Sequence, residues 1–204
     1  SPYRNNFFAS LHLYYDDGSF VDDFISTRIA EEANDSKYEG KPVMFGELGY
    51  QDDGVVIVDN NNMHRQLWAT LMSCGAAGAS WCWDIIEDSN LYTHYVAVST
   101  FANLIDFENT SYYNYKTAFI NETNAFGYVG NASAYLWIYK RNFGNISSAS
   151  YTVSNLNNGN YTVNWYNTVT GNIISTENKT VTNGNLSLTT PSFTDDIAVQ
   201  VIPQ

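Results

Sequence analysis

The sequence predicts an α/β region followed by an antiparallel all-β region, and a change in hydrophobic period along the chain is the observation behind that prediction. Up to about residue 105, short apolar runs typical of strands alternate with runs of helical spacing. Strands that alternate with helices are expected to pair in parallel, with the helices outside. Beyond about residue 125 the period drops to two, and Asn-Gly or Gly-Asn pairs separate the runs, as in antiparallel hairpins. We therefore expect two domains, over residues 1–122 and 123–204.

In the first domain, strands are expected over residues 7–15, 43–48 and 79–84, with Gly75-Ala76-Ala77-Gly78 ending the helix before the third strand. The first helix carries Asp22 and Asp23 in its first turn, where the helix dipole favours acidic side chains. The apolar faces of the second and last helices are expected to be Leu67, Trp68, Leu71, Met72, and Val98, Phe101, Ala102, Ile105.

The second domain is expected to be a β-sandwich. Its predicted strands cover residues 134–140, 151–153, 160–166, 173–176, 186–190 and 197–202. Alternation places Tyr161, Val163, Trp165, Ile197, Val199 and Val201 in its interior.

Composition narrows the classes of partner. The chain has 204 residues, a net charge of -12, 44% hydrophobic and 16% aromatic residues, so it can bury a core. Nucleic acids and anionic membranes select basic surfaces, so neither is expected as a partner. Sixteen Tyr and five Trp indicate uncharged, ring-shaped ligands or a β-rich core. No apolar run is long enough to span a bilayer, and no signal peptide is recognised.

Several Asn-x-Ser/Thr sequons predict a secreted or cell-surface glycoprotein, although so Asn-rich a chain also produces sequons by chance. They begin at Asn34, Asn109, Asn121, Asn131, Asn145, Asn160, Asn178 and Asn185. Cys74 and Cys82 fit either a short disulfide loop or two buried thiols. The three histidines lack ligand spacing, so neither a metal nor another cofactor is expected.

One carboxylate stands out in the segment from Lys41 to Tyr50. Glu47 ends a hydrophobic run that otherwise reads as a buried strand. A charge in such a place is costly unless it has a role. The alternative is a structural Glu, serving as a cap or a salt-bridge partner.

The order of these motifs resembles the last third of cellulase-like retaining glycoside hydrolases of clan A, which are (β/α)8 TIM barrels. Three segments carry the resemblance: Ser10 to Tyr15 as strand six, Lys41 to Gly49 as strand seven, and Trp81-Cys82-Trp83-Asp84 at the end of strand eight. The tail, including residues 161–166 and 191–199, resembles the small sandwich that follows such barrels. The resemblance implies a fold of the last barrel strands and helices followed by an antiparallel β-sandwich.

The resemblance also implies roles at the carboxyl ends of the strands, where barrel enzymes build their sites. Glu47 matches the catalytic nucleophile, His12 or Tyr14 would hydrogen-bond Glu47 or the sugar, and Trp83, with Trp81 one step deeper, would stack against the sugar ring. Trp81, Trp83 and His12 also fit core positions. Asp84 and Glu87 read better as solvated or helix-capping acids.

The chain departs from the family in lacking the Asn-Glu acid/base pair that follows strand four. Its one Asn-Glu, Asn121-Glu122, lies in the connection to the sandwich. A barrel needs roughly 250 residues, so the first five strands would lie in a missing N-terminal part, and the chain alone is expected to be inactive.

The leading hypothesis is therefore the C-terminal portion of a secreted hydrolase of β-linked polysaccharide, cellulase- or mannanase-like. The alternative is a non-catalytic extracellular glycoprotein, a fibre or surface component with a hydrolase-derived fold. A carbohydrate-binding module that uses the sandwich alone is weaker, because the sandwich aromatics alternate like core residues.

Overall fold

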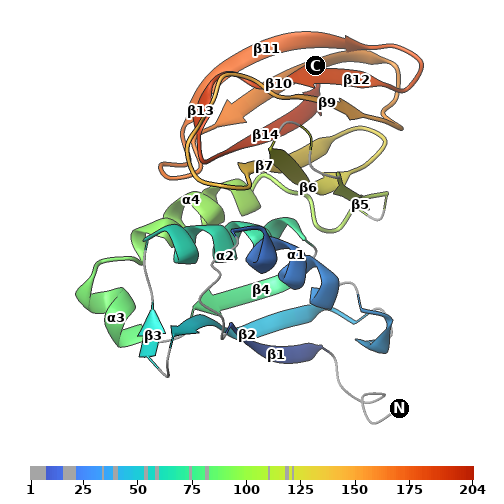
Figure 1. Ribbon diagram of the computed structural model, residues 1–204. Coiled ribbons are helices and arrows are strands. Elements are labelled where there is room, and N and C mark those ends of the chain that lie inside the picture. Colours follow the sequence, from blue (N-terminus) through green and yellow to red (C-terminus); the bar gives the residue numbers. More distant parts are fainter. Residues whose placement is uncertain are drawn as a thin grey trace. The chain divides into compact units, whose positions relative to one another are not determined.

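The computed structural model describes residues 8–15, 22–33, 35–38, 41–52, 55–57, 60–73, 75–80, 83–109, 111–117, 120 and 122–204. The chain divides into two compact units, Ser1–Val98 and Ser99–Gln204. The first mixes strands with helices and the second is built of strands (Figure 1). The expected domain boundary at residue 122 lies after strand β5 (Tyr113–Lys116), which belongs to the main sheet of the second unit.

A parallel sheet forms the centre of the first unit. Strand β2 (Val43–Asp52) lies between β1 (Ala9–Tyr15) and β4 (Gly75–Ser80), and both neighbours pair with it in parallel. The end of β2 also pairs in antiparallel with the short β3 (Val55–Ile57). The expected parallel, adjacent arrangement of the three main strands is confirmed. Between and after the strands come α1 (Asp22–Ala33), the 3-10 helix η1 (Ser36–Tyr38), α2 (Asn60–Met72), α3 (Trp83–Asp88) and α4 (Thr93–Ala102).

The boundaries of the third parallel strand were predicted wrongly. Residues 75–78, expected to end a helix, begin β4, and Trp83 and Asp84, expected at the end of that strand, begin α3. Small residues at the strand allow α2 to approach it closely. A Cβ on Gly78 would lie 2.7 Å from both Oγ1 and Cγ2 of Thr70 on α2.

Apolar residues of α2 make the core of the first unit. Met63 and Leu67 pack in a cluster with Ile86 and Leu91, and Trp68 and Met72 are also buried. Of the expected faces, Leu71 is only partly buried. In the last helix and just beyond it, Phe101 and Ile105 are buried, whereas Val98 and Ala102 are half-buried.

Antiparallel strands make up the second unit. Six of them form one sheet in the order β11-β10-β14-β7-β6-β5, and two pairs, β12 with β9 and β13 with β8, form separate two-stranded sheets. Their bounds are β6 (Thr123–Val129), β7 (Ala134–Lys140), β8 (Asn145–Ile146), β9 (Ser150–Val153), β10 (Gly159–Tyr166), β11 (Ile173–Val181), β12 (Leu186–Thr189), β13 (Phe193–Thr194) and β14 (Asp196–Pro203). All six expected strands are present, and β11 runs five residues further than predicted.

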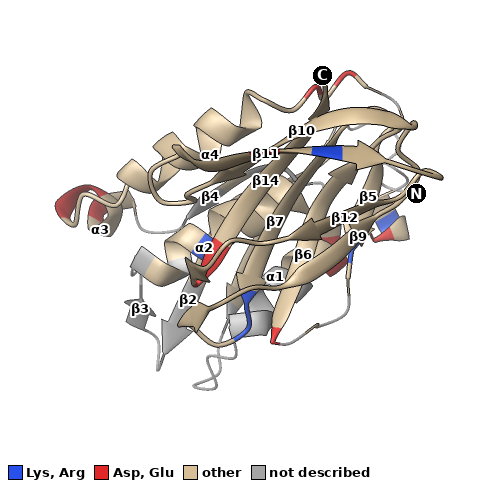
Figure 2. Cartoon of the chain, turned by 90° about the horizontal axis from the view of Figure 1, so that it is seen from above, with Lys and Arg blue, Asp and Glu red and all other residues tan. Residues whose placement is uncertain are grey.

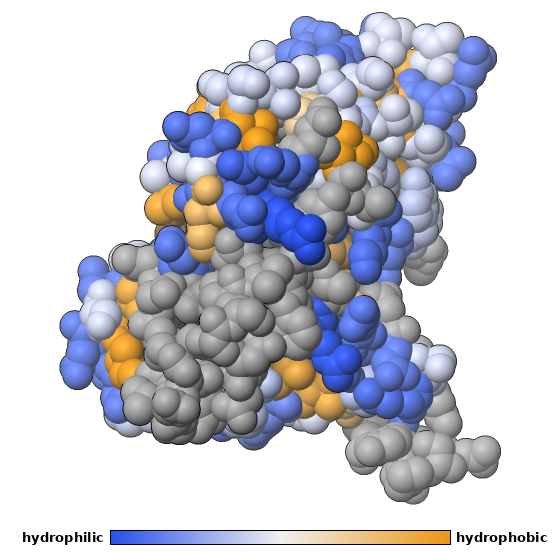
Figure 3. Space-filling model, in the orientation of Figure 1, coloured by the Kyte–Doolittle hydropathy of each residue, from blue (hydrophilic) through white to orange (hydrophobic). Residues whose placement is uncertain are grey.

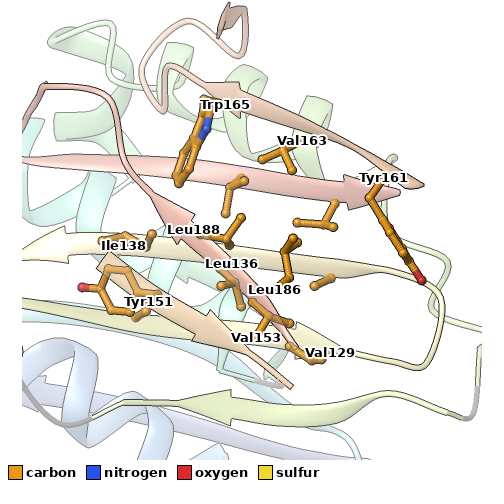
Figure 4. Packing of buried hydrophobic residues seen from close by; sticks show 14 of the residues in the cluster. Val129, Leu136, Ile138, Tyr151, Val153, Tyr161, Val163, Trp165, Leu186 and Leu188 are labelled. Atoms are coloured by element: carbon orange, nitrogen blue, oxygen red, sulfur yellow. The ribbon is translucent and has the colours of Figure 1, made fainter. Parts of the chain in front are cut away.

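The core of this unit lies between the six-stranded sheet and the β9–β12 pair (Figure 4). Tyr161, Val163 and Trp165 of β10 meet Leu186 and Leu188 of β12 there. The six residues expected in the interior are all buried: Tyr161, Val163, Trp165, Ile197, Val199 and Val201. Strand β6 was missed because every one of its residues is buried, so its sequence shows no alternation for a period-two search to find.

Among the described residues, no helix is both long and apolar enough to cross a membrane.

Candidate active site

A β-bulge in β2 aims Glu47. Leu11 of β1 pairs with Phe45, but the next residue, His12, pairs with Glu47, so Gly46 is an extra residue in β2. In a regular strand Glu47 would share a face with Phe45, which is fully buried. The bulge breaks this alternation and turns the carboxylate toward the partly exposed face that carries His12 and Tyr14.

Gly46 also makes room for the neighbouring side chains. A Cβ at this position would lie 3.1 Å from Ser10 Oγ and 3.2 Å from His12 Nε2. Both distances are tighter than ordinary van der Waals contact. A residue without a side chain therefore fits the bulge, and it lets the His12 ring lie directly beside the backbone of β2.

Two polar side chains, those of Tyr14 and His12, meet at one carboxylate oxygen of Glu47. The Tyr14 hydroxyl donates a hydrogen bond to Glu47 Oε2, and His12 Nδ1 lies 3.3 Å from the same oxygen. The Tyr14 hydroxyl and His12 Nδ1 are also 3.3 Å apart. When the His12 proton is on Nδ1, both groups donate to Oε2. Among the described residues, both of these contacts reach Oε2 and none reaches Oε1, and the Glu47 side chain is 35% exposed.

The structure thus brings together His12, Tyr14 and Glu47, which the sequence analysis selected from two separate segments. It differs from expectation in one respect: β2 does not end at Glu47 but continues to Asp52. Glu47 nevertheless lies beside the end of the neighbouring strand, because Ser80, the last residue of β4, pairs with Leu48.

Trp83 lies three residues after Ser80 in the sequence. As the first residue of α3 it is 74% exposed, which suits a ring that stacks on a ligand better than one that fills a core. Asp84 is exposed in the first turn of α3, as expected for a helix-capping acid, and Glu87 is exposed too. Trp81, Cys82 and Cys74 lie outside the described residues.

Glu122, the acid of the Asn121-Glu122 pair, has contacts that stabilise a turn. Glu122, in the second unit, has a left-handed backbone conformation with a φ of 67°, and its carboxylate lies 3.6 Å from Lys140 Nζ. Its carbonyl accepts a hydrogen bond from the amide of Arg141. Asn121 lies outside the described residues. These contacts give Glu122 a role in the turn before β6.

One pairing was missed by the sequence analysis. The rings of His64 on α2 and His94 on α4 meet with their Nδ1 atoms 3.3 Å apart. They are 30 residues apart, so only the fold could reveal their contact. No group of three or more His, Cys, Asp or Glu side chains suited to a metal ion occurs among the described residues.

The sequon asparagines of the second unit lie mostly at the surface. Asn131, Asn145, Asn160, Asn178 and Asn185 are exposed, and Asn109 is half-buried. Asn34 and Asn121 lie outside the described residues.

Comparison with known proteins places the fold among glycoside hydrolases. The chain superposes on a glycoside hydrolase family 5 protein from Bacteroides vulgatus with a TM-score of 0.58 and 14% identity, covering 99% of this chain and 52% of that one. It superposes on a family 30 endoxylanase from Clostridium papyrosolvens with a TM-score of 0.53 and 17% identity, covering 96% and 49%. A family 44 endoglucanase from a Clostridium gives a TM-score of 0.50 at 14% identity, covering 95% and 47%.

The chain therefore has a glycoside-hydrolase-like fold and spans about half the length of the structures it matches. No family profile matches the sequence. No curated protein matches it either.

Proposed function

We propose that this chain is the C-terminal part of a secreted, retaining glycoside hydrolase of clan A that cleaves β-linked polysaccharide, with Glu47 as its nucleophile. The observation that supports this proposal most is the bulge at Gly46. It directs Glu47 away from the core and toward Tyr14 and His12, which contact its carboxylate. A carboxylate held in this way at the carboxyl side of parallel strands has the position of a barrel nucleophile.

The chemistry follows from the two carboxylate oxygens. Tyr14 and His12 hold Oε2, which leaves Oε1 to attack the anomeric carbon and form a glycosyl ester. The bond from that carbon to the leaving sugar breaks, and an acid/base outside this chain protonates the departing oxygen. The same group then removes a proton from water, which hydrolyses the ester and frees Glu47. Trp83 supplies an exposed ring for a sugar to stack against.

The unpaired edges of the sheet in the first unit support the proposal that this sheet is part of a barrel whose other strands lie outside this chain. Within the described residues, β1 and β4 each pair only with β2, so each has one edge without a partner. Open edges of parallel strands are unusual in a complete domain. We assign these edges to the missing N-terminal part of the barrel. The second unit would then be the sandwich that follows the barrel.

The second unit gives little support to a binding module. Its two tryptophans, Trp137 and Trp165, are buried, and Trp137 donates to the buried Asp196 at 2.7 Å. The exposed sequons instead favour a second candidate, a non-catalytic extracellular glycoprotein with this fold.

Activity of the full-length protein distinguishes these functions. Hydrolysis of β-glucan, β-mannan and β-xylan is measured for the natural protein, for Glu47→Gln, and for Glu31→Gln, which changes an exposed acid on α1. The proposed nucleophile requires Glu47→Gln to lose several orders of magnitude in rate, with Glu31→Gln unchanged.

Covalent trapping identifies the attacking residue directly. A 2-deoxy-2-fluoro glycoside should add its sugar mass to the tryptic peptide of residues 38–65 in the natural protein, since trypsin does not cut between Lys41 and Pro42. It should add its mass to no peptide in Glu47→Gln. Equal activity in Glu47→Gln would remove Glu47 from the mechanism. Inactivity of the natural protein on all three polysaccharides would favour the structural glycoprotein.

A further inference from the structure

Two sequons of the second unit face each other across a pair of strands. Asn160-Tyr161-Thr162 lies in β10 and Asn178-Lys179-Thr180 lies in β11. Asn160 pairs with Thr180, and Thr162 pairs with Asn178. Because side chains alternate between the faces of a strand, these four side chains share one face of the β10–β11 ribbon. Tyr161, between them in sequence, points into the core.

The amide groups of both asparagines are compatible with an attached sugar. Thr180 Oγ1 donates to Asn160 Oδ1 at 3.0 Å, and an N-linked glycan on Nδ2 leaves that acceptor intact. Asn178 is exposed. Asn164, two residues further along β10, is different: its Oδ1 accepts from Thr176 and its Nδ2 donates to Gln200. This asparagine has both amide atoms engaged and begins no sequon.

Strand β11 needs protection along its outer edge. It is an edge strand of the six-stranded sheet, and among the described residues it pairs only with β10. A nine-residue edge presents a row of backbone groups to which a strand of another molecule can pair. Exposed apolar residues, Ile173, Ile174 and Val169, lie at its start and in the preceding turn, and apolar atoms reach the surface of this unit in several places (Figure 3).

Charge does not supply that protection. The sheet carries few charged residues (Figure 2), and β11 has one acid and one base, Glu177 and Lys179. These two pair with each other at 3.3 Å, so the edge has no net charge with which to repel a second copy.

We propose that Asn160 and Asn178 form a paired N-glycosylation site whose two glycans cover the outer face of β10–β11 and block edge-to-edge association through β11. This inference rests on the proposed secretion of the protein. It assigns a specific role to two of the eight sequons, and it predicts that both are occupied on the same molecule.

Mass spectrometry of the protein secreted by its native cells tests occupancy. Residues 142–179 contain no internal Lys or Arg, so trypsin releases Asn145, Asn160 and Asn178 on one peptide, and fragmentation locates each sugar. Sugars on both Asn160 and Asn178 of the same peptide are expected. Sugars elsewhere but not on this pair would overturn the inference alone. No sugar at any sequon would overturn it together with the proposed secretion.

Sedimentation velocity tests the protective role. The Asn160→Gln/Asn178→Gln double variant should self-associate more than the natural protein. Asn131→Gln, which removes a sequon at an exposed position in the β6–β7 turn, should sediment unchanged. Asn178→Gln keeps the Thr180–Asn160 hydrogen bond, so it separates the glycan from that bond. Equal sedimentation of the double variant and Asn131→Gln would overturn the protective role. Polysaccharide hydrolysis by the same samples reports the proposed enzyme function independently.

Discussion

At the scale of single residues, the site depends on one extra residue in a strand. Gly46 shifts the register of β2 against β1, and a period of two predicts side-chain direction only where the register is continuous. The alternating pattern would have placed Glu47 with the buried Phe45. Glu47 stood out in the sequence because a charged residue is costly in an apolar strand. The alternation of side chains along the strand did not predict its direction.

Under the proposed function, replacement of Tyr14 with Phe is expected to slow hydrolysis by the full-length protein without abolishing it. The change removes the hydroxyl that donates to Glu47 Oε2. A hydrogen bond to a charged group contributes about 1.5–3 kcal/mol, so kcat/KM should fall about ten- to a hundredfold.

Steady-state kinetics with Tyr113→Phe as the control checks this expectation, because Tyr113 is an exposed tyrosine of the second unit. Unaltered kcat/KM in the Tyr14→Phe variant would show that this hydroxyl does not act on the proposed nucleophile.

At the scale of elements, close packing of α2 on β4 determines where the third strand begins. A Gly-Ala-Ala-Gly run is ambiguous in sequence, since glycine commonly follows the end of a helix. In the fold, the run lies in the strand because it lets Thr70 of α2 approach β4.

Gly78→Ala should destabilise the first unit. The added Cβ would meet Oγ1 and Cγ2 of Thr70 at 2.7 Å, and overpacking typically costs about 1–3 kcal/mol. Urea unfolding of the full-length protein, followed by a signal from the first unit, measures the change.

The control is a double variant, Gly78→Ala combined with Thr70→Ala. The second substitution removes the Thr70 atoms that would clash with the new Cβ. The double variant should recover part of the lost stability relative to Thr70→Ala alone. Additive losses in the two variants would mean that the predicted contact is absent.

Two tyrosines of the second unit, the buried Tyr151 and the half-buried Tyr115, should make it sensitive to alkali. Burial raises the pKa of Tyr151 to about 12, against the opposing hydrogen bond to Thr123, and burial together with the nearby Tyr113 raises the pKa of Tyr115 to about 12. A tyrosine of the unfolded chain has a pKa of about 10. Between pH 10 and 12 the unfolded chain therefore binds fewer protons than the native one, so stability falls as pH rises.

Ultraviolet absorbance and circular dichroism recorded from pH 9 to 13 check this. The native protein should show a group of tyrosines that ionise late, and Tyr151→Phe should reduce its amplitude. Ionisation of all tyrosines near pH 10 while the fold persists would contradict the prediction.

At the scale of the whole molecule, β1 and β4 each have an edge that is unpaired among the described residues, and under the proposed function these edges belong to a longer barrel. We expect the isolated 204-residue chain to hydrolyse no β-linked polysaccharide, because the proposed mechanism takes its acid/base group from the N-terminal part of the barrel. The natural full-length protein, assayed on the same substrates, is the reference. Turnover by the isolated chain that disappears in Glu47→Gln would show that the second carboxyl group lies within these residues after all.

The sequence by itself determined the order of the elements, the parallel and antiparallel halves, and the selection of His12, Tyr14 and Glu47, three side chains that the structure brings into contact. These depend on hydrophobic period, turn chemistry and strand-end motifs, which are local properties. Only the tertiary structure decided the bulge at Gly46, the start of β4, the fully buried β6 and the contact between His64 and His94. Each of these arises from atoms that meet across elements, where packing and register between strands override the preference of the local sequence.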